Sequence, residues 1–168
     1  AGNMSIGVGQ SSSGAMHIDG GTVTVGGTYI GLGHNQSASG TLTISGGSLM
    51  AAANLSVGHN SASVGTVYMS AGSLSLTTIS VANGTNSTGT VAIGGGDVKL
   101  TNGMVIGIGQ SASGTFAIGG GTVTASTISM GQNTCATGLL SMTGGTLTIA
   151  NTLSLGLYYS TSGTLDIA

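Results

Sequence analysis

The segment GTLTISGGSL, residues 40–49, is one of seven near-copies in this chain. Similar segments begin at Gly14, Gly65, Gly89, Gly114, Gly138 and Gly163. Consecutive copies lie 26, 25, 24, 25, 24 and 25 residues apart. A fixed period of this length indicates a repeat architecture. The 168-residue chain is therefore expected to hold nearly seven copies of one structural unit of about 25 residues.

Each unit contains three short runs in which apolar and small polar residues alternate. Examples of the first, second and third runs are NLSV (54–57), GTLTI (40–44) and GSLSL (72–76). Alternation with period two predicts half-buried strands, and the many glycines and β-branched residues argue against helices. Three strands are an odd number, so hairpins would reverse every other copy, whereas a coil keeps all copies parallel. The sequence predicts a single all-β domain over 1–168, a parallel β-helix (β-solenoid) of about seven coils, three short strands per coil and about 30–35 Å in height.

The apolar residues of equivalent runs are expected to stack into three core columns. The column of first runs is expected to contain Met4/Ile6, Leu55/Val57, Ile79/Val81, Met104/Ile106, Ile128/Met130 and Leu153/Leu155. Glycines are expected to turn the chain at the end of these runs, at Gly7, Gly31, Gly58, Gly107, Gly131 and Gly156. Proline is absent from the sequence, as expected where each coil's N–H groups bind the next coil.

Charge is almost absent from this chain. Only Asp19, Asp97, Lys99 and Asp166 are charged, which is 2% of the residues, against about 25% in a typical soluble domain. Nucleic acid is therefore not an expected partner, because phosphate binding requires clusters of Lys and Arg. Membrane insertion is not expected either, because no uninterrupted run of 18 apolar residues occurs.

Three longer segments show a family resemblance. They are IGLGHNQSASGTLTISGGSL (30–49), LSVGHNSASVGTVYMSAGSLSL (55–76) and TISMGQNTCATGLLSMTGGTLTI (127–149). These segments resemble the Gly/Ser/Thr-rich repeats of bacterial surface proteins, found in autotransporter passengers and in proteins with a PEP-CTERM sorting signal. The resemblance implies a right-handed β-solenoid that is exported to the cell surface. The first residue, Ala1, fits a chain processed after secretion, so an extracellular location is expected.

No catalytic residue and no cofactor are expected, and the protein is not expected to be an enzyme. Carbohydrate-cleaving enzymes built on β-solenoids need paired carboxylates, or a carboxylate with Lys or Arg. Asp97 and Lys99 lie two residues apart on one third run, and we interpret them as an outward-facing charge pair. Cys135 is the only cysteine, which excludes an intrachain disulfide, and we interpret it as a turn residue.

A pair of histidines is the one candidate for metal binding. His34 and His59 lie 25 residues apart, in the same corner of successive coils, so their side chains are expected to stack. No third ligand of Cys, Asp or Glu type lines up with them, which favours a structural role over a metal site. Calcium is not expected, because calcium-binding solenoids carry an Asp in every turn.

The outward positions of the third runs carry hydroxyl groups. They include Thr22, Thr24, Ser73, Ser75, Thr122, Thr124, Thr146 and Thr148. Such arrays resemble the ice-binding faces of antifreeze proteins, although Met50 and the Asp97–Lys99 pair interrupt this one. The simpler interpretation is that Thr is an ordinary outward residue of a strand. A further hypothesis is that these hydroxyls carry covalent O-linked glycans, which would keep a nearly uncharged surface soluble.

The two ends of the solenoid are expected to lack capping elements. Met4 and Ile6 lie in the first coil, and Leu165 and Ile167 lie in the last. Unpaired strand edges above an apolar core promote association, and head-to-tail stacking would form an open filament. The leading hypothesis is an extracellular structural protein that assembles with itself into a surface or matrix fibre. Two alternatives stay open: an adhesin or other binding module for glycans or ice, and a segment of a longer chain.

Overall fold

The computed structural model describes residues 2–168, and β-strands are the only regular secondary structure in this range. The strands of the first three coils are β1 (Met4–Ile6), β2 (Ser13–Ile18), β3 (Thr22–Val25), β4 (Tyr29–Leu32), β5 (Ser39–Ile44), β6 (Ser48–Ala51), β7 (Asn54–Val57) and β8 (Val64–Met69). The strands that follow are β9 (Ser73–Val81), β10 (Thr88–Ile93), β11 (Asp97–Ile106), β12 (Ser113–Ile118), β13 (Thr122–Met130), β14 (Thr137–Met142), β15 (Thr146–Leu155) and β16 (Ser162–Ile167).

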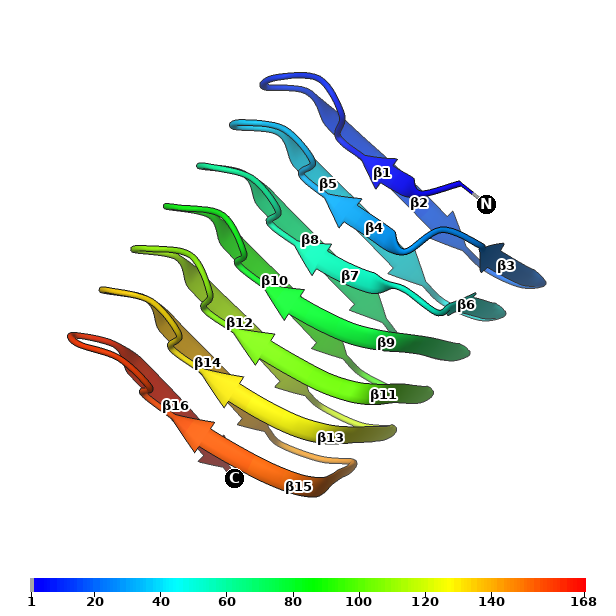
Figure 1. Cartoon of the computed structure of the whole chain (residues 1–168). Helices are drawn as coiled ribbons and strands as arrows, with labels where there is room; N and C mark the ends of the chain where they lie inside the picture. The colour runs from blue at the N-terminus through cyan, green and yellow to red at the C-terminus, as the bar shows by residue number, and fades with distance from the viewer. Residues whose placement is uncertain (1) are drawn as a thin grey trace.

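All paired strands are parallel and form two sheets. The second runs make a sheet in the order β2-β5-β8-β10-β12-β14-β16, and the first and third runs make the other sheet. In Figure 1 the front strands run to the left, the rear strands run to the right, and the chain descends from the N-terminus, which is a right-handed coil. The predicted parallel β-solenoid of about seven coils with a 25-residue spacing is therefore confirmed.

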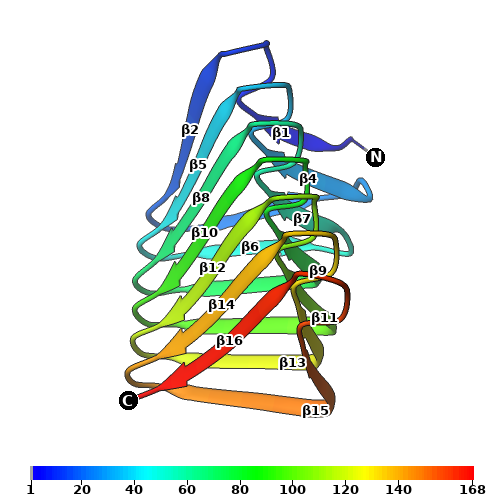
Figure 2. The same cartoon turned by 90° about the vertical axis from the view of Figure 1, so that its left-hand side faces the viewer.

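The third and first runs are not separate strands throughout the solenoid. They are separate in the first two coils, as β3 and β4 and then as β6 and β7. From β9 onward one strand of nine or ten residues covers both runs. The pairing register shifts within these strands, for example between Lys99 and Gly103 and between Ala125 and Thr127. Such bulges bend a strand without ending it, and Figure 2 shows the long strands forming two sides of a triangular cross-section.

The core is a continuous column of aliphatic side chains with one aromatic residue, Phe116, which is fully buried. The column of first runs also contains Ile30 and Leu32, which the sequence pattern did not identify. Met69, Met104 and Met130 are buried within this core, where their flexible side chains fill gaps between coils. Within residues 2–168, no helix is long and apolar enough to cross a membrane.

One predicted corner is wrong. Gly31 does not end the first run of the second coil, because it lies inside β4 and pairs with Ser56 of β7. The turn is made at Gly33, whose φ of +66° matches the φ of +74° at Gly58. The segment from Tyr29 to Gly33 contains two glycines, and alternation alone assigned the turn to the wrong one.

The longer corner between the first and second runs repeats one backbone conformation. Its central residue has a φ between +53° and +59° in every coil, at Ser11, Ser37, Ala62, Asn86, Ser111, Cys135 and Ser160. The N–H group of this residue usually donates to a carbonyl of the following coil, as Ser11 does to Gln36 and Ser111 does to Thr134. Cys135 occupies the same position, in agreement with its interpretation as a turn residue.

Candidate functional site

The two end coils are the places where strand edges have one neighbour instead of two. β1 and β2 lie at one end of the two sheets, and β15 and β16 lie at the other. Every strand between them is paired on both sides with strands of adjacent coils, except β3, which pairs only with β6. An outermost strand presents unpaired backbone N–H and C=O groups, which can pair with another strand.

The four residues predicted for the ends differ in exposure. At the first coil, Ile6 is buried and Met4 is half-buried. At the last coil, Leu165 is half-buried, whereas Ile167 is 66% exposed. The difference follows from the coils themselves, because the first coil includes a third run, β3. Among the described residues, the last coil has a first run, which is the second half of β15, and a second run, which is β16, but no third run.

The last coil also exposes an apolar tip that the sequence analysis missed. Leu157, Tyr158 and Tyr159 are 45%, 63% and 90% exposed. They lie in the longer corner, where the equivalent positions of the preceding coil are Gln132, Asn133 and Thr134. The sequence did carry a signal for this tip, because Tyr158 and Tyr159 replace the polar Asn133 and Thr134 of the preceding coil. Exposed aromatic residues beside an unpaired edge are typical of contact surfaces.

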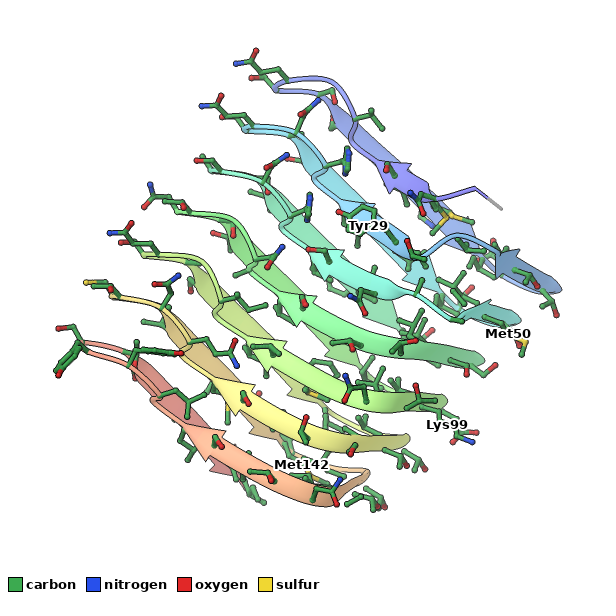
Figure 3. The ribbon with its side chains drawn as sticks, in the orientation of Figure 1. Tyr29, Met50, Lys99 and Met142 are labelled. Atoms are coloured by element: carbon green, nitrogen blue, oxygen red, sulfur yellow. The ribbon has the colours of Figure 1, made fainter. Side chains whose placement is uncertain are left out.

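The two candidate metal ligands do come together, as expected. The imidazole rings of His34 and His59 are stacked, with centroids 5.3 Å apart and planes 6° apart. The ring of Tyr29 lies against both, at centroid distances of 5.5 Å and 4.8 Å. Figure 3 shows Tyr29 lying along the outer side of the solenoid. A Cβ on Gly31 would collide with the Tyr29 hydroxyl oxygen, so this glycine makes room for the ring.

The Nδ1 atoms of both histidines have hydrogen-bonding partners within the protein. The His34 Nδ1 lies 3.4 Å from the Tyr29 hydroxyl, and the His59 Nδ1 lies 3.1 Å from Ser56 Oγ and 3.3 Å from Asn83 Nδ2. Burial, and then the charge of His34, lower the pKa of His59. Burial raises the pKa of Tyr29, with the hydrogen bond to Ser56 opposing the change.

The side chains of this cluster do not favour a metal centre. Among residues 2–168, no third His, Cys, Asp or Glu joins the two histidines. The cluster is better described as an aromatic ladder that joins the second and third coils on their outer side.

The outward hydroxyls of the third runs form two aligned columns, as the repeat predicted. One column contains Thr22, Ser48, Ser73, Asp97, Thr122 and Thr146, and the other contains Thr24, Met50, Ser75, Lys99, Thr124 and Thr148. Ser73 Oγ donates to Ser48 Oγ over 2.8 Å, so part of the first column is bonded internally. Figure 3 shows Met50 and Lys99 projecting from the outer side of this region, where they interrupt the columns.

A shallow groove of about 460 Å³ lies beside these columns. It is lined by Thr24, Val25, Met50, Ala51, Ala52, Ser75, Leu76, Thr77 and Thr101. The lining is aliphatic and hydroxyl-bearing, and it contains no ionisable group. Such a groove has none of the general acids or bases that catalysis would use.

Comparison of the chain with protein-family models, curated proteins and solved structures gave no match. The resemblance to the repeats of bacterial surface proteins therefore stays a prediction from the sequence. The end coils, the histidine–tyrosine cluster and the hydroxyl columns must be interpreted from their own geometry.

Proposed function

We propose that this chain is an extracellular structural subunit, and that its copies stack head to tail into a surface or matrix fibre. The last coil of one copy would pair with the first coil of the next. The mechanism is the one that joins coils within the chain: parallel backbone hydrogen bonds around a continuous apolar core. The contact is heterologous, so it generates an open filament.

One observation carries this proposal: the first and last coils are equivalent to one another without a gap. Residues 7–18, GVGQSSSGAMHI, align with residues 156–167, GLYYSTSGTLDI. The backbone is also equivalent, with φ of +72° and +64° at Gly7 and Gly156 and of +55° and +57° at Ser11 and Ser160. The first coil of a second copy can therefore follow the last coil in the register that adjacent coils of one chain use.

This register would bring together pairs of side chains in which both members are apolar. The pairs would be Leu153 with Met4, Leu155 with Ile6, Leu157 with Val8, Leu165 with Met16 and Ile167 with Ile18. Among these residues, Leu155, Leu157, Ile167 and Val8 are 46%, 45%, 66% and 51% exposed in the single chain. Stacking would remove this apolar surface from water, which stabilises the contact by about 25 cal/mol for each Å² buried.

Backbone groups at the junction would continue existing ladders. Within the chain the N–H of Leu157 donates to the carbonyl of Gly131 over 3.0 Å, and the N–H of His34 donates likewise to Gly7. At the junction, the N–H of Val8 in the next copy would donate in the same way to the carbonyl of Gly156 in the copy before it. The first and second runs would pair across the junction, while the third-run column would be interrupted by the width of one strand.

The test is sedimentation velocity and electron microscopy of the full 168-residue chain over a range of concentrations. We expect long filaments one solenoid wide. We expect Ile167→Asp to abolish them, because the new charge would be buried at each junction. Tyr68→Asp, at a 52% exposed position in the middle of the solenoid, is the matched control and should still form filaments. Monodisperse wild-type monomers at high concentration would overturn the proposal.

The second candidate function is a binding module for glycans or ice. It is favoured by the register that aligns Thr22, Thr122 and Thr146, and Thr24, Thr124 and Thr148, in two columns on one face. Thermal hysteresis or glycan binding by isolated monomers would support it. Loss of that activity in a Thr122→Val, Thr124→Val variant that folds normally would assign it to this face.

A further inference from the structure

We infer that His17 and Asp166 form a polar pair across each junction and select the head-to-tail contact. This inference rests on the proposed function, and it names the residues that give the contact its register. His17 is an outward, exposed residue of β2, and Asp166 is an outward, exposed residue of β16. In the gap-free alignment of the two end coils, these two residues occupy the same position.

The pairing of the second runs defines one outward column along the whole solenoid. From the first coil to the last it contains His17, Thr43, Tyr68, Ala92, Ala117, Ser141 and Asp166. Its interior is uncharged, and its imidazole and its carboxylate stand at opposite ends. In a stack of two copies the column would continue from Asp166 to His17, one strand spacing apart.

The surroundings of the pair contain few other ionisable groups. His17 faces Thr43 on β5, with Tyr68 of β8 one coil further on, and Asp19 follows it by two residues. Asp19 accepts a hydrogen bond from Ser45 Oγ. Asp166 faces Ser141 on β14. A junction that opposes His17 and Asp166 therefore joins the only imidazole and the only carboxylate on this column.

Opposite charges that face each other across paired strands stabilise the pairing, and like charges destabilise it. The chain has only four charged residues and three histidines, so its junction has few other ionisable groups that could pair across it. The pair would also oppose a shifted register, because a one-residue slip would turn one partner toward the apolar core.

The experiment measures the critical concentration for filament formation of four chains by sedimentation. Relative to wild type, His17→Asp should raise this concentration about three- to fivefold at low salt, because two carboxylates would face each other. The exchange variant, His17→Asp with Asp166→His, should return within about twofold of wild type. Ala92→Asp, in the middle of the same column, controls for added charge and should have no effect.

The exchange variant also separates the junction from effects within one chain. It keeps the new aspartate at position 17 near Asp19, so recovery can come only from the partner across the junction. Addition of salt should reduce the defect of His17→Asp, because exposed charges are screened. If wild-type chains do not stack, both proposals fail. If they stack but His17→Asp matches Ala92→Asp, or the exchange does not restore assembly, the pairing inference is overturned while the proposed function stands.

Discussion

The middle coils and the last coil have the same sequence pattern and very different burial. In the column of first runs, Leu55, Ile79, Met104 and Ile128 are at most 1% exposed, whereas Leu153 is 37% exposed. All five occupy equivalent positions in paired strands. The difference arises from neighbours, because a middle coil has a coil on both sides and the last coil has one. Burial in this solenoid is therefore a property of stacking, as expected for a quasi-one-dimensional fold.

The largest predicted effect is on the free energy of unfolding, when a leucine of the first-run column is replaced by alanine in a middle coil or in the last coil. Leu55→Ala should lower the free energy of unfolding by about 2–5 kcal/mol, because it leaves a cavity in a fully enclosed core. Leu153→Ala should cost less than about 1 kcal/mol in dilute monomers, because that side chain is already partly in water. Urea denaturation of both variants measures the difference. Equal losses would show that the last coil is as enclosed as the middle ones.

A second comparison uses two glycines at the same corner of different coils. Gly21 in the first coil has a φ of +71°, and a Cβ added there would have no atom within 4 Å. At Gly96 (φ +83°) an added Cβ would lie 2.5 Å from the Gly72 carbonyl oxygen. Gly21→Ala should cost about 1–2 kcal/mol for the left-handed backbone alone. Gly96→Ala should cost more, since the backbone of the preceding coil must also move. Thermal unfolding of the two variants checks this, and equal melting temperatures would contradict it.

The smallest predicted effect concerns acid stability of the histidine–tyrosine cluster. The pKa of His59 is lower in the folded chain than its ordinary value of 6.5, so folding favours the neutral ring. The corresponding stability is complete above pH 6.5 and is lost as the pH falls through the lowered folded-state pKa. His59→Asn should reduce this loss, and Asn is compatible with the site because Asn83 follows in the next coil.

The measurement is the melting temperature between about pH 7.5 and about pH 4.5, a range that spans the titration of histidine. In dilute monomers, where His17 has no partner copy, His17→Asn removes an imidazole from an exposed position on another face and serves as the control. A His59→Asn variant with the acid dependence of the wild-type chain would show that the cluster does not contribute to it.

The repeat made much of this structure predictable. Alternation identified inward residues such as Leu42 and Val91, and the fixed period placed His34 over His59 and aligned the outward threonines. These features depend on only two things: whether a side chain projects from the inner or the outer face of its strand, and how many residues make one coil. Both can be read directly from the order of residues.

Other features depended on contacts that the period does not contain. Third and first runs join into one strand where a bulge replaces a corner, as between Lys99 and Gly103, and local alternation looks the same in both cases. The placement of the Tyr29 ring over Gly31 reflects side-chain packing, and at Gly33 an added Cβ would meet the backbone carbonyls of Ala38 and Val64. The exposed tip at Tyr158 lies where the last coil departs from the repeat, so the period itself gives no indication of it.

In the proposed filament, the last coil of one copy continues into the first coil of another. Cryo-electron microscopy of filaments grown from the 168-residue chain tests it most directly. Stacked copies should show strands perpendicular to the filament axis at a spacing of about 4.8 Å, and a subunit repeat of about seven such spacings, about 34 Å. Particles that stay at the 15.9 kDa monomer mass at every concentration, or filaments without the axial repeat of about 34 Å, would contradict it.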